Sequence, residues 1–523
     1  MAALPQREPV SASRGYSNTN HVETYGYPNQ QVYRYLSQPG DTDFFARPDS
    51  VQLFDYPNDT NSGVSFNSWY ANDMINLTPQ LTLNAGVRFD RYGSWLPEQG
   101  NPGTGPFAER NLYPETHDFP VYNALSPRVS LIYDVSGNGR IALKTSYGRY
   151  AASGSGVNAS SGPVASSVNP AATRTTTYRW NGAVPYVPNP ADLTAVSGSS
   201  RDTRLDPGLK AEGMDEYTGG VDLGLTRDLT VRVNVVRKLD WGGSKEINLA
   251  LPFSSFTDLR TGVDPGRDNT AGTADDGIVE VWSVPRSDPN FGQLRSLVTN
   301  TSPGEGEDKY WAFEATASKR YSAGWSLLAS YSWDRRDVRN PEPQTPNQAR
   351  YNWELPLTYQ GARVSGTYEL PWNILVASTY TAQMGEYYPR IVQVRNALNS
   401  LVNVTVEGQA GRYDWVKLMD LRLAKTFPIG RHSLEGMFDV FNVTNSNVVL
   451  RLVTTNGRDF MKPLATSGID AASANPIPAP RISGSAHVGN SEPTIAGTAE
   501  DIAPQTPESC DVCGGILELS VFP

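Results

Sequence analysis

The chain has 523 residues, of which 38% are hydrophobic and 10% aromatic, and its formal net charge at pH 7 is −10. The negative charge argues against a nucleic-acid partner, because binding to phosphates requires a basic surface. No apolar run approaches the roughly 18–20 residues that a membrane-spanning helix requires, which excludes a helical membrane protein. The many glycines, prolines and aromatic residues favour strands joined by irregular loops.

Residues 1–63 form a polar N-terminal segment that contains several tyrosines. Its start, MAALPQREPVSASRGYSNTN, lacks the basic residues and the apolar stretch of a signal peptide.

The stretch QLTLNAGVRFDRYGSW, residues 80–95, alternates between apolar and polar or small side chains. The apolar set runs from Leu81 to Phe89 and the polar set from Thr82 to Asp90. A strand sends these sets to opposite faces, so the pattern predicts a strand with one apolar and one polar face. Less perfect alternation recurs near residues 129–135, 141–148, 229–236, 325–333, 363–370 and 433–440.

These strands are joined in pairs by short connections that contain Pro, Gly, Asn or Asp, as hairpin turns require. Six hairpins are predicted, near residues 64–92, 126–150, 215–240, 309–335, 359–383 and 414–443. The connections between hairpins are long and structureless in pattern, at roughly 93–125, 151–214, 241–308, 336–358, 384–413 and 444–480. Short turns at one end and long loops at the other are typical of an outer-membrane barrel, whereas a soluble sandwich has more even loop lengths.

Aromatic residues gather at the strand ends, for example Trp69, Tyr147 and Trp333. Amphipathic rings favour the boundary between lipid and water. Ordinary core aromatics are the alternative, but the charged residues on the opposite strand faces fit a water-filled lumen better than a core. We therefore predict an all-β fold, an antiparallel transmembrane β-barrel with short periplasmic turns and long extracellular loops.

WYANDMINLTPQLTLNAGVRFD (69–90), LSPRVSLIYDVSGNGRIALKTSYGRY (125–150) and LMDLRLAKTFPIGRHSLEGMFDVFNVTN (418–445) are strand–turn–strand sequences. Together they resemble TonB-dependent outer-membrane receptors, and the Oar-like transporters most of all. The resemblance covers roughly residues 64–482, with gaps in the loops. It implies a barrel of about 22 strands whose lumen is closed by a plug.

On this resemblance, residues 64–443 correspond to the C-terminal half of the barrel, with about 12 of its strands. Residues 1–63 would then be an extracellular loop, and residues 444–482 the last one. The plug and the early strands are expected to be absent, so the TonB complex would act only through a plug that this chain lacks.

Residues 483–523 show no alternation and are polar and rich in Gly and Pro, so we expect them to be disordered. A frameshift after about Ile482 would produce such a tail. The alternative is a native extension in which residues 516–523 form a displaced last strand.

Two polar segments carry aromatic residues that are candidates for ligand contact, because aromatic side chains on outer loops hold a ligand at little entropic cost. Packing within the loops or the girdle is the alternative. The candidates are Tyr25, Tyr27, Tyr33 and Tyr35 in the first segment and Tyr178, Trp180 and Tyr186 in the second.

The sequence DPGRDNTAGTADDG, residues 264–277, supplies oxygen ligands of the type that calcium prefers. Its spacing does not match an EF-hand loop, and an acidic, solvated loop is the alternative. The candidate ligands are Asp264, Asp268, Asn269, Asp275 and Asp276. No other cofactor is predicted, because Cys510 and Cys513 form a single CxxC and zinc requires four ligands.

None of the four histidines lies in a recognisable pattern with a nucleophile, so no enzyme is predicted. The leading hypothesis is that the chain is a fragment of a receptor in the bacterial outer membrane. The whole receptor would be surrounded by lipid and import a large scarce nutrient of the siderophore or oligosaccharide class. The alternatives are a secreted or surface-attached adhesion or carbohydrate-binding protein, with its apolar faces buried between two sheets, and an unplugged porin.

Overall fold

A computed structural model describes residues 6–7, 11–25, 31–35, 48–55, 58–107, 110–117, 121–151, 169–171, 174–198, 202, 204–354, 356–406, 411–446, 448–449, 451–456, 460–462, 481–485, 487–488 and 517–522. Within these ranges there are one α-helix, α1 (Pro346–Tyr351), and two 3-10 helices, η2 (Pro190–Asp192) and η3 (Phe253–Ser255). None of the described helices is long and apolar enough to cross a membrane.

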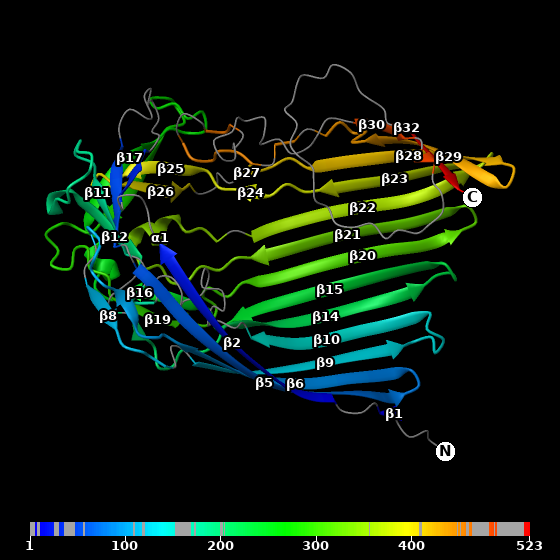
Figure 1. The fold of residues 1–523 in the computed structure, drawn as a ribbon, viewed down its shortest axis with the longest axis horizontal. Helices are drawn as coiled ribbons and strands as arrows, with labels where there is room; N and C mark the ends of the chain where they lie inside the picture. The colour runs from blue at the N-terminus through cyan, green and yellow to red at the C-terminus, as the bar shows by residue number, and fades with distance from the viewer. Residues whose placement is uncertain are drawn as a thin grey trace.

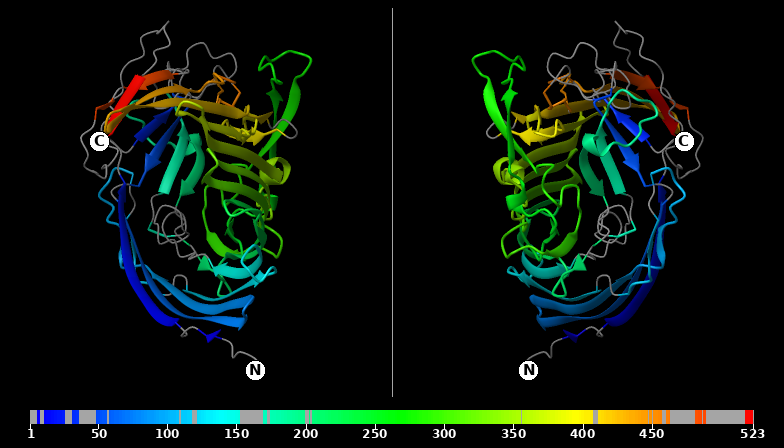
Figure 2. Two further views of the ribbon diagram at one scale, coloured as in Figure 1. Left: turned by 90° about the vertical axis from the view of Figure 1, so that its right-hand side faces the viewer. Right: turned by 90° about the vertical axis from the view of Figure 1, so that its left-hand side faces the viewer.

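Twelve long antiparallel strands form the main sheet, and each is hydrogen-bonded to the next one along the chain (Figure 1). Viewed along the strands, the sheet curves around an interior (Figure 2). The predicted fold class and its six hairpins are confirmed. The strands are β5 (Asn58–Thr78), β6 (Leu81–Trp95), β9 (Val121–Asp134), β10 (Ile141–Ala151), β14 (Gly213–Gly224), β15 (Leu229–Trp241), β20 (Lys309–Ser322), β21 (Trp325–Asp337), β22 (Pro356–Leu370), β23 (Ile374–Gln383), β28 (Val416–Ile429) and β29 (His432–Phe441).

The turns inside the six hairpins are short and lie together at one end of the sheet, on the right in Figure 1. In the β20–β21 turn Ser322 pairs with Trp325, and Ala323 and Gly324 between them have φ of 51° and 81°. Two consecutive residues with positive φ give a type I′ turn, whose twist matches that of the paired strands. In the β9–β10 turn the carboxylate of Asp134 accepts hydrogen bonds from nearby backbone N–H groups. Turn chemistry therefore fixes the register of these hairpins.

The N-terminal part of the chain differs from the sequence-based expectation. β2 (Ser11–Tyr25) pairs along its whole length with β5, and β1 (Gln6–Arg7) pairs with a later part of β5. The expectation that residues 1–63 form a loop is therefore wrong for residues 11–25. The sequence SASRGYSNTNHVETY has no apolar alternation, and the strand forms by pairing its backbone groups with the long β5.

The opposite edge of the sheet is completed by short strands that pair with β29. β30 (Arg481–Ser485) pairs with one part of β29, and β32 (Leu517–Phe522) pairs with the part nearer the turn. β31 (His487–Val488) runs parallel to β32. In place of the expected disorder, residues 517–522 thus form a short strand, whereas most of the tail lies outside the described residues.

The long connections gather at the other end of the sheet, on the left in Figure 1. They carry short strands, and four of these form a sheet in the order β12-β11-β4-β3. We call residues 31–55, 96–117, 169–212, 242–308, 338–354, 384–415 and 442–462, where described, the loop layer. Its strands are β3 (Gln31–Arg34), β4 (Ser50–Phe54), β7 (Gln99–Asn101), β8 (Asn111–Tyr113), β11 (Arg174–Arg179), β12 (Leu193–Gly198), β13 (Arg204–Leu205), β16 (Ser244–Asn248), β17 (Asp258–Asp264), β18 (Gly277–Ser283), β19 (Ser296–Asn300), β24 (Tyr387–Tyr388), β25 (Ile391–Arg395), β26 (Leu401–Thr405) and β27 (Gly411–Arg412).

The loop layer has a hydrophobic core of its own. Val281 of β18, Val392 of β25 and Val404 of β26 are fully buried and pack in one cluster. β18 belongs to the connection after β15, and β25 and β26 belong to the connection after β23, so this packing joins two distant loops. The expectation of structureless connections is wrong here, because short valine-rich strands bury enough apolar surface to order them.

Candidate functional site

The two faces of the main sheet differ in polarity from β6 to β29. Arg232 of β15 pairs with Asp222 and Thr316, whereas the next residue, Val233, pairs with two apolar residues of the same neighbouring strands. The polar face carries Arg88, Asp90, Arg128, Lys144, Glu216, Asp222, Arg232, Lys238, Glu314, Asp334, Arg363, Asp420, Arg422 and Asp439. The apolar face carries Leu83, Val87, Phe89, Val129, Leu131, Leu143, Val221, Val233, Val235, Phe313, Tyr331, Val364, Val376, Leu423 and Phe438.

Charged side chains of the polar face pair across neighbouring strands. Asp222 contacts Lys144 at 2.6 Å on one side and Arg232 at 2.9 Å on the other. Arg422 donates two hydrogen bonds, of 2.6 and 2.7 Å, to Asp439. The cationic partners stay partly exposed, and partly exposed charges are stable in water but not in hydrocarbon. The polar face therefore borders water.

The apolar face ends, on the side of the loop layer, at a row of aromatic rings. The ring centroids of Trp69 and Phe89 are 5.8 Å apart, and those of Tyr147 and Tyr217 are 5.1 Å apart. One alternation step beyond Tyr147, charges appear on the same face, where Arg149 donates two hydrogen bonds of 2.7 Å to a carboxylate. The change from rings to charges marks the boundary between lipid and water.

The height of the apolar band can be read along β21, which has a tryptophan near each end of its apolar face. Trp325 begins β21 on the apolar face, and Trp333 lies eight residues further along the strand. Eight steps at about 3.3 Å give roughly 26 Å, close to the apolar band of about 25 Å in outer-membrane barrels.

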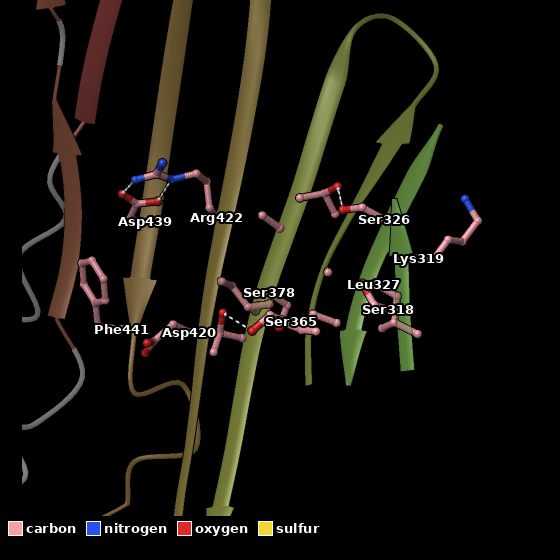
Figure 3. Close-up of a pocket in the computed structure, with 16 residues that line it drawn as sticks. Ser318, Lys319, Ser326, Leu327, Ser365, Ser378, Asp420, Arg422, Asp439 and Phe441 are labelled. Atoms are coloured by element: carbon pink, nitrogen blue, oxygen red, sulfur yellow. Dashed lines mark hydrogen bonds and ion pairs between the residues drawn. The ribbon is translucent and has the colours of Figure 1, made fainter. Parts of the chain in front are cut away.

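A cavity of about 560 Å³ lies on the polar face over β20, β21, β22, β23, β28 and β29 (Figure 3). Hydroxyl groups line much of it: Ser326 and Thr367 share a hydrogen bond of 2.6 Å, and Ser365 and Thr379 share one of 3.2 Å. A cavity that touches six neighbouring strands lies on the concave side of the curved sheet. The concave, water-facing wall thus offers neutral hydrogen-bonding groups, with the Arg422–Asp439 pair at its β29 side (Figure 3).

Four of the seven predicted aromatic site residues meet in the loop layer. Tyr33, Tyr178, Trp180 and Tyr186 pack together against β4. Tyr186 is only 2% exposed, and its ring centroid lies 5.5 Å from that of Tyr178. Its N–H donates a hydrogen bond of 3.0 Å to the Tyr33 hydroxyl. Burial raises the pKa of Tyr186 to about 12, because the phenolate is disfavoured away from water.

The other three aromatic candidates do not join this cluster in the described residues. Tyr25 is the last residue of β2, and Tyr27 lies outside the described residues. Tyr35 follows β3 and is exposed. The structure therefore separates the seven residues into a packed group and individual positions.

The chain matches the model of the outer membrane beta barrel domain family over residues 13–390, which is most of its length. This chain belongs to that family. The apolar face of the outer-membrane barrel sheet contacts the lipid of the bacterial outer membrane, and the polar face borders the lumen.

Several solved structures are similar to this barrel chain at low sequence identity. The siderophore receptor PiuA from Acinetobacter baumannii is 12% identical, with a TM-score of 0.38, over 79% of this chain and 42% of the receptor. The ferric-catecholate import receptor Fiu from E. coli K12 is 12% identical, with a TM-score of 0.42, over 86% of this chain and 53% of the receptor. The ferric yersiniabactin uptake receptor FyuA from Yersinia pestis is 12% identical, with a TM-score of 0.35, over 78% of this chain and 44% of the receptor.

The barrel chain spans about half the length of these solved structures. No curated protein matches it.

In the barrel, the acidic sequence 264–277 forms the tip of the β17–β18 hairpin in the loop layer. Asp264 is buried and accepts two hydrogen bonds from the guanidinium of Arg390, which precedes β25. The carboxylate is therefore part of a buried ion pair that connects two loops.

The other acidic side chains of this tip bind the backbone of the tip itself. Asp275 accepts a hydrogen bond of 2.7 Å from the N–H of Arg267 and one of 2.8 Å from the hydroxyl of Thr273. These hydrogen bonds hold the pKa of Asp275 below its ordinary value. Asp268 and Asp276 likewise accept hydrogen bonds from backbone N–H groups of the tip. The described residues contain no group of three His, Cys, Asp or Glu side chains that is suited to a metal ion, and Cys510 and Cys513 lie outside them.

Sequence reasoning identified the polar face but missed the core of the loop layer. The signal was present in SVQLF (50–54) and IVQVR (391–395), each of which contains four consecutive positions where apolar and polar residues alternate. Such short stretches inside long polar connections resemble loops unless each is tested for a period of two.

Proposed function

We propose that this barrel chain forms the wall of an uptake receptor that carries a large, scarce nutrient across the outer membrane. The carrying observation is the concave polar face with its cavity of about 560 Å³, behind a continuous apolar face that contacts lipid. Hydroxyl groups hold a hydrated solute through several weak hydrogen bonds, which permits both binding and release. We assign the nutrient to the siderophore or oligosaccharide class and the chain to the Oar-like receptors, as its sequence suggests.

Energised uptake is part of this proposal. In TonB-dependent receptors an inner-membrane complex acts through a plug in the lumen. In our proposal the polar face is the wall against which such a plug is seated, and the described residues supply the wall. The partners are then outer-membrane lipid, the nutrient and, through the plug, the TonB complex.

The soluble adhesion protein is disfavoured by the exposure of the apolar face. Leu125 and Leu143 lie on this face and are 60% and 47% exposed. A soluble sandwich would bury such residues between its two sheets. An unplugged porin would have the same polar and apolar faces. The growth experiment below distinguishes a porin from a receptor.

The test is growth of the native bacterium with and without the gene that encodes this chain. Panels of ferric siderophores and of oligosaccharides are supplied as the only source of iron or of carbon. We expect the deletion to abolish growth on one of these sources, and the intact gene to restore growth only when the TonB complex is present. Restoration without the TonB complex would replace the receptor by a passive porin, and unchanged growth on every source would contradict nutrient uptake.

A further inference from the structure

A second cavity, of about 520 Å³, lies over one face of the four-stranded sheet β12-β11-β4-β3 in the loop layer. The strand register places Leu53, Thr176 and Val196 side by side on this face. Val51 is on the same face and is covered by the Tyr186 cluster. One half of the face is thus packed as a core, and the other half is hollow.

The roof of this cavity comes from two other loops. Phe107 follows β7, and Phe291 to Gln293 lie between β18 and β19. Gly292 has φ of 76°, and a Cβ there would lie 3.4 Å from Leu193 of β12, so the segment crosses close to the sheet. The guanidinium of Arg286 lies over the Phe291 ring, 5.6 Å from its centre. Aromatic and aliphatic side chains therefore enclose the cavity from both sides.

The polar groups of the cavity are few and differ in their pairing. The Oδ1 atom of buried Asp55 accepts a hydrogen bond of 2.8 Å from the backbone N–H of Arg174. The guanidinium of Arg174 has no carboxylate partner in the part of the chain that the structure describes. By contrast, Arg179 at the other end of β11 is paired with Asp192 at 3.0 Å. The positive charge of Arg174 also counteracts the rise that burial causes in the pKa of Tyr178, another residue that lines the cavity.

We propose that this cavity binds a ligand group in which a carboxylate is joined to an aromatic or aliphatic ring. The planar guanidinium of Arg174 binds the carboxylate through two parallel hydrogen bonds. The ring lies between Tyr178 and Phe291, and Thr176 and Gln293 hydrogen-bond the polar linker. The volume lies within the range of known small-molecule sites. As a statement about the imported nutrient, this inference rests on the proposed uptake function.

The experiment measures binding of hippurate, which joins a benzoyl ring to a carboxylate through an amide, to the purified full chain in detergent micelles by isothermal titration calorimetry. We expect hippurate to bind, and Arg174→Gln to weaken binding at least tenfold. Arg174→Lys keeps the charge but not the two-pronged geometry, so it should weaken binding less. The neutral amide of hippurate should bind the unaltered chain as poorly as hippurate binds the Gln variant. Arg227→Gln, in the exposed β14–β15 turn, makes the same charge change and should leave the affinity unchanged.

A second variant tests the cavity without altering its charge. Val196→Trp fills the space beside Thr176 and should abolish binding of hippurate, while circular dichroism confirms that the strands remain intact. Equal affinities for Arg174→Gln and the unaltered chain would overturn the inference, as would an absence of hippurate binding to the unaltered folded chain. TonB-dependent growth without hippurate binding contradicts this inference alone. Hippurate binding with TonB-independent growth contradicts only the proposed uptake function.

Discussion

At the scale of single residues, two substitutions of Tyr186 distinguish how much its ring and its hydroxyl each contribute to the stability of the loop layer. Its ring fills the core between β4 and β11, so Tyr186→Ala should lower the free energy of unfolding of the loop layer by about 3–5 kcal/mol. Tyr186→Phe keeps the ring and should change it by no more than about 1 kcal/mol. The rate of limited proteolysis within the loop layer measures the stability of each variant. Equal rates for the two variants would contradict the proposed packing of the Tyr186 ring in the core.

The same residue gives a dependence on pH. The folded pKa of Tyr186 is about 12, above the ordinary value of 10.0, so its contribution to stability is fully present below pH 10. That contribution is lost as the pH rises through 12, because the unfolded chain then gains stability by ionising its phenol. The proteolysis rate of the unaltered chain should therefore rise between pH 10 and 12 more steeply than that of Tyr186→Phe. An equal rise of the proteolysis rate with pH in the two proteins would contradict the raised pKa of Tyr186.

The buried pair of Asp264 and Arg390 makes a third prediction at this scale. Asp264→Asn leaves a buried guanidinium without its counter-charge, which typically costs about 3–5 kcal/mol. Replacing both residues together, with Leu and Met, removes the charge as well and should recover part of this loss. Urea unfolding of the loop layer would show the order unaltered chain, double variant, single variant, in decreasing stability. A double variant that is less stable than the single one contradicts the pairing argument.

At the scale of elements, the sequence predicts those strands whose side chains alternate against two different solvents. Leu81 to Asp90 face lipid and water in turn, so β6 could be located from its pattern alone. β2 could not, because it is formed by backbone pairing with β5 and its sequence has no alternation. The strands of the loop layer were missed because they are about five residues long and their core is assembled from separate connections.

The β20–β21 turn allows a prediction about hairpin stability. Ala323 has φ of 51°, a conformation that Asn adopts more easily than Ala, so Ala323→Asn should stabilise the hairpin by about 0.5 kcal/mol. Gly324 has φ of 81°, and Gly324→Ala should destabilise it by about 1 kcal/mol. Refolding titrations in urea with lipid vesicles compare the two variants. The reverse order would show that the turn does not have the type I′ conformation.

Adjacent positions on β15 test the two faces of the sheet directly. Val233 lies on the apolar face and Asn234 on the polar face, opposite Glu314. Val233→Arg places a charge in lipid and should destabilise the barrel by about 2–4 kcal/mol, whereas Asn234→Arg should have an effect near zero. The same titrations measure both variants. A larger cost at Asn234 than at Val233 would reverse the assignment of faces.

At the scale of the whole molecule, the family and the two faces define a wall between lipid and water, but they leave the transported solute open. The orientation of this wall can be mapped by chemical labelling after Cys510 and Cys513 are replaced by Ser. A water-soluble maleimide should label Ser330→Cys on the polar face much faster than Ala329→Cys on the apolar face, when the chain is in lipid vesicles. Equal labelling rates at the two positions would contradict the assignment of one face to water and the other to lipid. The sequence predicted this wall because the alternation recurs in many of its strands, whereas the cavities require the joint placement of several strands.

The interlocked loop layer has a consequence for the diversification of such receptors. Asp49, near the N-terminus, forms an ion pair with Arg395 of β25, which lies more than three hundred positions later. The core of β18, β25 and β26 joins the connection that contains Arg395 to the connection after β15. A loop in this arrangement is not an independent module. Transplanting one loop from a relative would import half of each contact, so recombination within the gene should yield working hybrids only where both halves of a contact move together. New specificities would then arise through paired substitutions at distant sites more often than through the exchange of single loops.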